Sequence, residues 1–197
     1  MSNLDISQNI VKMFDASIEI KEASKKCLVS PIEKAINLLI TTYKNNNKTL
    51  ICGNGGSAAD AQHFAAELIC RFERERPSLP SIALTTDSSA LTAISNDYSY
   101  SEVFARQVSG LGQIGDLLIA ISTSGNSSNI IRAIEEAHNK NISVIALTGK
   151  DGGKIKTLLK ETDIEIRVPS KSTARIQEVH ILTIHCLCEQ IDKNLFG

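Results

Sequence analysis

Apolar and polar positions divide the chain into two parts that meet near Lys48. Beyond that point, short and largely β-branched apolar runs alternate with longer amphipathic stretches. Such runs are typical of strands that are buried on both faces of a parallel sheet. We predict strands over residues 49–53, 81–85, 116–122, 143–147 and 164–168.

The stretches between these strands are long enough for crossover helices. We predict helices over residues 57–72, 88–110, 127–140 and 154–160, the second of them broken, and a final helix over 174–194. Strands and helices that alternate in this way fold as an α/β three-layer sandwich with a five-stranded parallel sheet. Ligands of such sheets bind beyond the carboxyl ends of the strands.

The first part of the chain has apolar positions at helical spacing. Residues 4–28 form one predicted helix, and Ser30-Pro31 supplies the cap and first position of a second. Both helices have apolar stripes that another surface must cover. We expect a single domain over residues 1–197, in which 1–46 is an N-terminal helical extension that packs on the sheet or at a subunit interface.

Composition narrows the function classes. The chain has 197 residues, 42% of them hydrophobic, a formal net charge of -1 and no basic run, so nucleic acid is not an expected partner. The five cysteines are odd in number and include no C-x-x-C pair, which is typical of a reduced cytoplasmic protein. No apolar run approaches the length of a membrane span and the N-terminus lacks a signal-peptide pattern, so we expect no membrane association.

A glycine-rich segment at the end of the first predicted strand is the strongest chemical signal. Gly53-Asn54-Gly55-Gly56 forms a turn in which backbone N–H groups can approach a ligand, and the next helix begins near Ser57. We expect Ser57 to cap that helix, whose positive end points at the ligand. Strand, turn and helix start together predict an anion site.

His63 and Glu67 follow on the same predicted helix. They are four residues apart, so they project from one face a single turn from each other. An imidazole and a carboxylate so placed suit either metal binding or acid/base chemistry. The pair begins about two turns along the helix from the anion site.

A second loop of this kind follows the third predicted strand. Ser122-Thr123-Ser124-Gly125-Asn126-Ser127 places hydroxyls on both sides of a glycine at the start of a helix, where they can donate to phosphate oxygens. The chain has neither the P-loop lysine pattern nor G-x-G-x-x-G at the first loop, which favours a phosphomonoester over a nucleotide. In the alternative, Asn126 or Ser127 only caps the helix.

In these two loops and in Leu147-Thr148-Gly149-Lys150-Asp151-Gly152-Gly153, the chain resembles the sugar isomerase (SIS) family, and within it the phosphoheptose isomerases. The resemblance extends over essentially the whole chain and includes Arg71-Phe72-Glu73, Asn96-Asp97-Tyr98 and residues 175–180. It implies a flavodoxin-like SIS fold and an aldose-ketose isomerase that converts D-sedoheptulose 7-phosphate to D-glycero-D-manno-heptose 7-phosphate through an enediol. It also implies a role in bacterial heptose biosynthesis, for lipopolysaccharide or capsule.

The resemblance further implies roles for individual residues, with Glu67 and His185 as the catalytic pair. The residues that match substrate or phosphate contacts are Asn54, Gly55, Gly56, Ser57, Glu67, Asn96, Asp97, Ser122, Thr123, Ser124 and Ser127. Those that match the ligands of one zinc ion per subunit are His63, Glu67, Gln177 and His185. Glutamine is an uncommon zinc ligand, so a substrate contact is the equal alternative for Gln177. Ala174 departs from the pattern, because some relatives carry an acidic residue there.

Ketose-to-aldose isomerisation explains these residue types. The reaction moves a proton between adjacent carbons, so it needs a base for the C–H bond, a proton shuttle to oxygen and a stabiliser of the developing oxyanion. Glu67 is the better candidate for the base, and His185 exchanges protons near neutral pH. Zinc would supply the electrophile.

The spacing of Gln177 and His185 suggests an oligomer. They are eight residues apart on the final predicted helix, which corresponds to about 12 Å of rise and ~80° of rotation. Either their side chains lean toward a shared point, or neighbouring subunits complete the site. The family resemblance implies a homotetramer with active sites at subunit contacts.

A non-enzymatic function is the competing hypothesis. The chain also resembles the DnaA initiator-associating proteins, tetramers that bind a replication initiator, in Arg74-Glu75-Arg76-Pro77-Ser78-Leu79-Pro80 and Cys186-Leu187-Cys188. Those relatives lack the glutamate and histidine pair, whereas Glu67 and His185 are both present here, which favours an enzyme. A sugar-phosphate-sensing regulator would need a DNA-binding module, and the first 48 residues are not patterned like one.

Overall fold

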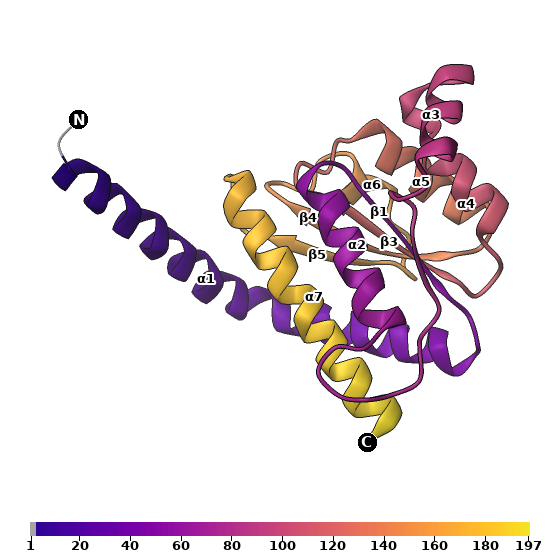
Figure 1. The fold of residues 1–197 in the computed structure, drawn as a ribbon, viewed down its shortest axis with the longest axis horizontal. Helices are drawn as coiled ribbons and strands as arrows, with labels where there is room; N and C mark the ends of the chain where they lie inside the picture. The colour runs from indigo at the N-terminus through magenta and orange to yellow at the C-terminus, as the bar shows by residue number, and fades with distance from the viewer. Residues whose placement is uncertain (1–2) are drawn as a thin grey trace.

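Five parallel strands form the central sheet of the computed structural model, which describes residues 3–197 (Figure 1). The strands are β1 (Thr49–Gly53), β2 (Ser81–Ala83), β3 (Leu117–Ser122), β4 (Ser143–Gly149) and β5 (Ile164–Val168). Their order in the sheet is β2-β1-β3-β4-β5, and neighbouring strands are parallel throughout. The predicted α/β fold with a five-stranded parallel sheet is confirmed.

Helices precede, connect and follow the strands. They are α1 (Asn3–Lys44), α2 (Gly56–Ile69), α3 (Ser88–Asp97), α4 (Ala105–Leu111), α5 (Ser128–Asn139), α6 (Ile155–Leu158) and α7 (Thr173–Phe196), with a 3-10 turn η1 (Tyr100–Glu102) between α3 and α4. The helix that we predicted as broken therefore consists of α3, η1 and α4. Asp87 sets the start of α3, because its carboxylate accepts a hydrogen bond from the Ala90 N–H at 2.9 Å.

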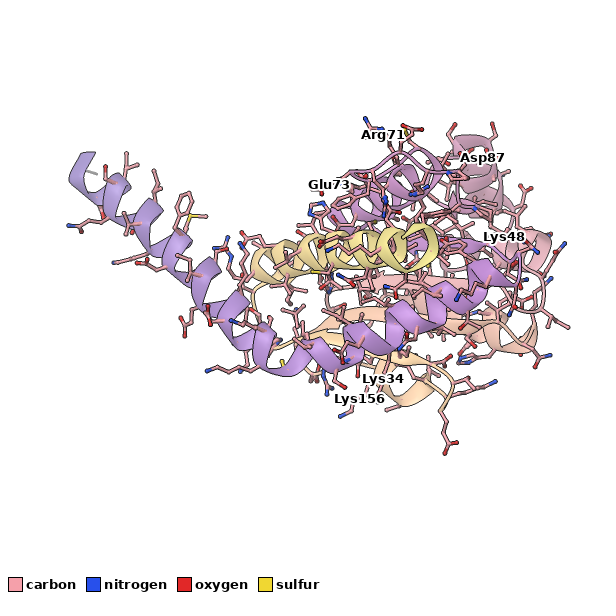
Figure 2. The ribbon with its side chains drawn as sticks, turned by 90° about the horizontal axis from the view of Figure 1, so that it is seen from below. Lys34, Lys48, Arg71, Glu73, Asp87 and Lys156 are labelled. Atoms are coloured by element: carbon pink, nitrogen blue, oxygen red, sulfur yellow. The ribbon has the colours of Figure 1, made fainter. Side chains whose placement is uncertain are left out.

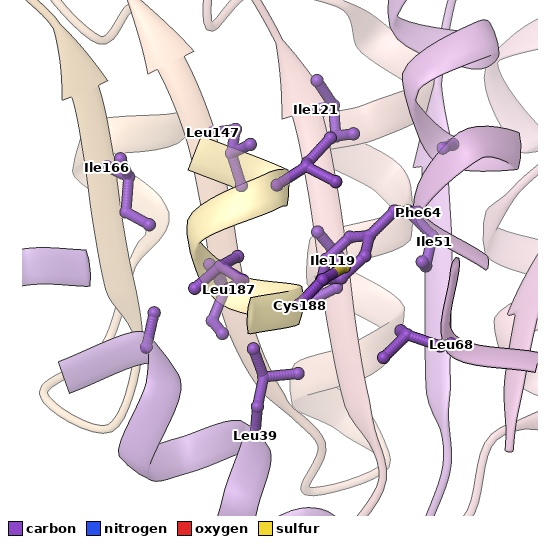
Figure 3. Packing of buried hydrophobic residues seen from close by; sticks show 14 of the residues in the cluster. Leu39, Ile51, Phe64, Leu68, Ile119, Ile121, Leu147, Ile166, Leu187 and Cys188 are labelled. Carbon is purple, nitrogen blue, oxygen red and sulfur yellow. The ribbon is translucent and has the colours of Figure 1, made fainter. Parts of the chain in front are cut away.

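The sheet is covered on both faces, because its central strands are buried at every position. One face packs against α1, α2 and α7, and Figure 3 shows Phe64 of α2 near Cys188 of α7 on this face. The other face packs against α4, α5 and α6, with Ile130 and Ile155 among its buried side chains. These three layers leave the carboxyl ends of the strands open to a ligand.

The N-terminal region is one helix, so the prediction of two helices was wrong. α1 runs without interruption, and Pro31, which we expected to open a second helix, lies inside it. Buried side chains before and after the proline, including Leu28 and Ala35, pack into the same core and hold the helix together. Proline removes one helical hydrogen bond, a usual cause of a bend. α1 bends along its length (Figures 1 and 2).

The two parts of α1 have different surroundings. The second part joins the core through Leu28, Ala35 and Leu39, whereas the first part extends away from the rest of the molecule (Figure 2). Its large apolar side chains are 50% to 68% exposed, at Ile6, Ile10, Val11, Met13, Phe14 and Ile18. A single chain therefore leaves an apolar stripe uncovered. Among the described residues, no helix has the length and apolar character needed to cross a membrane.

Candidate active site

Two loops lie side by side at the carboxyl edge of the sheet. β1 and β3 are neighbours, and Gly53 at the end of β1 pairs with Ile121 of β3. The glycine-rich loop (residues 53–56) and the serine-rich loop (residues 122–128) therefore leave the sheet next to each other. Each loop leads directly into a helix, α2 or α5.

The glycine-rich loop turns tightly into α2. Gly55 has a φ of 56°, a left-handed conformation that favours glycine. The helix begins at Gly56 with Gly55 at its N-cap, so the prediction that Ser57 caps it was wrong. Ser57 is buried inside the first turn, and its N–H donates to the Asn54 carbonyl at 3.0 Å. The left-handed glycine starts the helix earlier than a serine cap would.

A pair of side-chain amides joins the two loops. Asn54 Nδ2 donates to Asn129 Oδ1 at 2.8 Å, and Asn129 Nδ2 donates back to Asn54 Oδ1 at 2.8 Å. The hydroxyl of Tyr100 donates to the same Asn54 oxygen at 3.1 Å. Asn129 itself is 2% exposed, in the first turn of α5. Asn54 is thus held from two sides, and one N–H of its amide has no partner among the described residues.

Our sequence reasoning missed Asn129 and Tyr100. Asn129 is four residues before Ala133 and shares the buried face of α5, where a polar side chain needs a partner. That spacing was the available signal. Tyr100 is 46 residues after Asn54, and no local pattern connects the two.

The serine-rich loop gathers hydroxyls around a left-handed glycine. The hydroxyls of Ser122 and Ser127 are 3.1 Å apart, and Gly125 between them has a φ of 66°. Ser127 occupies the N-cap position of α5, but its side chain makes no capping hydrogen bond. This argues against the alternative in which Ser127 only caps the helix. Thr123 and Ser124 lie half-buried in the same loop.

The turn that follows β4 supports the serine-rich loop. A Cβ on Gly125 would collide with the backbone of Gly152, so the two segments are in direct contact. Asn126 adds two hydrogen bonds: its Oδ1 accepts from the Lys154 N–H at 3.1 Å, and its Nδ2 donates to the Ser124 carbonyl at 3.0 Å. Contacts with the turn after β4 therefore hold the serine-rich loop in place.

His63, Glu67 and His185 form a polar cluster between α2 and α7. Nε2 of His63 lies 3.2 Å from Nε2 of His185 and 3.3 Å from Oε1 of Glu67. The rings of Phe72 and His185 are in contact, with centroids 5.7 Å apart. His63 is exposed and Glu67 half-buried, so a ligand can reach both.

Gln177 contacts α2 at a different position along the helix from His185. Its Nε2 would lie 2.5 Å from a Cβ on Gly56, at the start of the helix. His185, eight residues further along α7, contacts His63, seven residues further along α2. The two contact points on α2 are about 10 Å apart along its axis. The structure therefore brings His185 to the cluster and leaves Gln177 at the glycine-rich loop.

Asn96 and Asp97 make no direct contact with the two loops through hydrogen bonds, among the residues that the structure describes. They end α3, which has no buried residue and stands at the outer edge of the molecule (Figure 1). The Asn96 amide donates to Asp97 Oδ1 at 2.9 Å. Within residues 3–197, neither side chain has a hydrogen bond to the glycine-rich or the serine-rich loop.

His180, the other histidine of α7, is a core residue. It is fully buried, and its Nε2 donates to the Thr148 carbonyl at 2.9 Å. Burial lowers the pKa of His180 to about 4, so the ring is neutral at pH 7. The interpretation of His180 as a packing residue is confirmed.

The His63 cluster has the donor types that zinc prefers. In a tetrahedral zinc site with bonds of about 2.0 to 2.1 Å, neighbouring donor atoms are about 3.3 Å apart, and the two contacts of His63 match that spacing. Both contacts pass through His63, however, and no three His, Cys, Asp or Glu side chains of the described chain stand ready to hold a metal ion. A metal would need Glu67 and His185 to turn toward each other.

Comparison with known proteins relates this site to one family. Residues 12–149 match the SIS domain family. The phosphoheptose isomerase of Chromohalobacter salexigens is 56% identical over 194 residues, which cover 98% of this chain and 98% of that protein.

Two solved structures agree with that match. The phosphoheptose isomerase from Neisseria gonorrhoeae has a TM-score of 0.92 and 51% identity, and the match covers 95% of this chain and 99% of that one. The phosphoheptose isomerase from Francisella tularensis has a TM-score of 0.93 and 46% identity, over 98% of this chain and 100% of that one. The likeness thus spans nearly the full length of all three chains.

Proposed function

The chain belongs to the SIS domain family and, within it, to the phosphoheptose isomerases, and from this premise we propose that it converts D-sedoheptulose 7-phosphate to D-glycero-D-manno-heptose 7-phosphate. It is a sugar-phosphate isomerase that serves heptose biosynthesis. The relatives that match it over nearly its full length are named isomerases, which favours this function over binding of a replication initiator.

The layout of α2 is the observation that carries the proposal. The helix begins at the glycine-rich loop, which lies beside the serine-rich loop, and the acid/base cluster is about two turns further along it. The substrate has a matching layout, because its phosphate and its reacting carbons are at opposite ends of a seven-carbon chain. One end of α2 can therefore hold the phosphate while the other acts on C1 and C2.

Glu67 and His185 divide the proton transfers between them. Glu67 takes a proton from C1 of the ketose while the C2 oxygen gains a proton, which gives the enediol. The C1 hydroxyl then loses its proton and C2 receives one, which gives the aldose. His185 serves the two oxygens, since an imidazole both donates and accepts protons near neutral pH. His63 lies in contact with both side chains.

The loops hold the remainder of the substrate. The hydroxyls of Ser122, Thr123, Ser124 and Ser127 donate to the phosphate, with support from the N-terminus of the 12-residue helix α5. Asn54 donates its free N–H to a sugar oxygen, and Gly55, Gly56 and Ser57 contribute the backbone next to it. Gln177 contacts the substrate from its position against Gly56.

We propose zinc as the cofactor, one ion per subunit, held by His63, Glu67 and His185. The support is the chemistry of these donors and their spacing of 3.2 and 3.3 Å. When bound, zinc would supply an electrophile for the oxygens of the sugar. A carboxylate on the metal is a weaker base, so Glu67 and His185 would exchange between the metal and the substrate to move protons.

We further propose a cytoplasmic homotetramer. The exposed apolar stripe of α1 supports self-association, because its side chains have no cover in a single chain. Asn96 and Asp97 are exposed and available to a neighbouring subunit, which fits active sites at subunit contacts. All five cysteines are free thiols, which fits a reducing compartment.

Turnover of D-sedoheptulose 7-phosphate by purified protein of known zinc content tests the proposal. We expect the wild type to be active, and Glu67→Gln and His185→Ala to lose about 100-fold or more in kcat while they remain folded and oligomeric. Glu135→Gln and His138→Ala are matched controls, because they change the same residue types away from the site.

The outcomes separate the claims. A wild type without turnover, even after zinc is restored, would contradict the proposed isomerase function. An active wild type together with an active Glu67→Gln or His185→Ala would contradict only the role of that residue.

A further inference from the structure

A buried arginine that the proposed reaction does not use lies at the carboxyl end of α2. Arg76 is in the loop between α2 and β2, and its side chain is 1% exposed. It belongs to the segment that resembles the DnaA initiator-associating proteins. Its guanidinium donates to four acceptors: the Glu67 carbonyl at 2.7 Å, the Leu68 carbonyl at 2.7 Å, the Pro77 carbonyl at 3.0 Å and Asp192 Oδ1 at 2.8 Å.

The bonds to the Glu67 and Leu68 carbonyls satisfy acceptors in the last turn of α2. The last carbonyls of a helix have no partner within it, and a cation there also interacts favourably with the helix dipole. α2 has no basic residue in its own last turn, so Arg76 supplies the charge from outside. One of the two carbonyls belongs to Glu67, and the backbone of the proposed base is thereby fixed.

The same guanidinium also reaches α7. Its Nε pairs with Asp192, whose side chain is 4% exposed. Asp192 is seven residues after His185, about two helical turns, and so lies on the same side of α7. One ion pair therefore ties the helix that carries Glu67 to the helix that carries His185.

Stability alone does not account for this pair. Asp192 Oδ2 is buried and has no hydrogen-bond partner among the described residues. Desolvation of two buried charges offsets much of their attraction, and an unsatisfied oxygen adds to the cost. An apolar pair of similar volume would fill this space at no such cost. Unlike an apolar pair, the ion pair fixes the geometry between α7 and the carboxyl end of α2.

We propose that Arg76 and Asp192 are positioning residues of the active site, whose ion pair sets the separation of Glu67 on α2 and His185 on α7. The inference rests on the proposed isomerase function. A small displacement of a catalytic group slows the chemical step strongly. The phosphate-binding loops are at the opposite end of α2 and keep their contacts. A weakened pair should therefore lower kcat and leave KM unchanged.

Asp192→Asn tests the proposal, because it keeps the size of the side chain and removes the charge. We expect kcat to fall by about 10-fold to 100-fold with KM within about 2-fold of the wild type. The matched control is Asp116→Asn. That carboxylate is equally buried and pairs with Lys48, but it lies at the amino edge of the sheet, away from the loops. The control should have a lower melting temperature than the wild type, with kcat and KM both within about 2-fold of the wild-type values.

Arg76→Lys is the second variant, for use if Asp192→Asn does not fold. Lysine keeps the charge but lacks the planar fork that reaches two carbonyls and a carboxylate together, so the same loss of kcat is expected. A folded Asp192→Asn or Arg76→Lys with normal kcat, or an equal loss in Asp116→Asn, would overturn the proposal while the isomerase stands. An inactive wild type would overturn both.

Discussion

Among single residues, His180 gives the chain a defined pH dependence of stability. Burial lowers its pKa from 6.5 to about 4 in the folded chain. Between these values the unfolded chain binds a proton that the folded chain does not. The contribution is therefore complete above pH 6.5 and is lost as the pH falls toward 4, where the loss reaches about 3 kcal/mol.

We predict that His180→Gln removes this dependence, since glutamine keeps an N–H donor but does not titrate. The stability difference between wild type and variant should shrink by about 2 kcal/mol from pH 7 to pH 4.5. Urea unfolding at the two pH values measures it. A difference that stays constant would mean that the folded protein accepts a proton at His180.

Local chemistry was the predictable part of the site. The two loops and the spacing of His63 and Glu67 are each contained in a few consecutive residues, and a sequence pattern describes them directly. The start of α2 was predicted at the wrong residue, because Ser57 is a good cap by type whereas Gly55 is a better one by conformation. A residue type is visible in the sequence, but a φ angle is not.

At the scale of elements, α1 shows that packing can override a local signal. Ser30-Pro31 is typical of a helix start, yet Leu28 and Ala35 bury on the same core and keep the helix continuous. The sequence does not reveal that the residues on either side of Pro31 bury in the same core. The strands were predictable because parallel strands are apolar along their length. Only their ends shifted, as in β2, which ends at Ala83 instead of residue 85.

Pro31→Ala should stabilise α1. Alanine restores the N–H that can donate to the Cys27 carbonyl, and proline inside a helix costs about 3 kcal/mol. We expect the free energy of unfolding to rise by about 1 to 3 kcal/mol, measured at one protein concentration. Ser30→Ala, a control in the same turn, should change it by less than about 0.5 kcal/mol. A less stable Pro31→Ala would show that the bend is needed for packing.

For the molecule as a whole, the exposed stripe of α1 predicts self-association. Phe14 is 68% exposed in the single chain, and Phe14→Asp should convert the proposed oligomer to smaller species and reduce turnover. Lys12→Asp is the control, because Lys12 is about 160° away around the helix. Sedimentation velocity and the isomerase assay on the same samples measure both effects. A fully active monomer would contradict the predicted oligomer.

Long-range pairings were beyond the reach of sequence patterns. Arg76 and Asp192 are 116 residues apart, and Asn54 and Asn129 are 75 apart. Each of these four residues has an ordinary local explanation as a loop charge, a turn residue or a helix cap. Their partners are decided by which strands are neighbours and which helices share a face of the sheet.

The position of α7 ties catalysis to the order of synthesis. This helix carries His185, and through Leu187 and Cys188 it also covers the sheet face on which α2 packs. While α7 is still inside the ribosome, the emerging chain has the two loops and Glu67 but lacks His185, the proposed proton shuttle, and the part of the core that α7 supplies. We therefore expect a chain without docked α7 to have an incomplete core and no isomerase activity. We therefore expect the activity of a cell extract to report only those molecules in which α7 has left the ribosome and packed against the sheet.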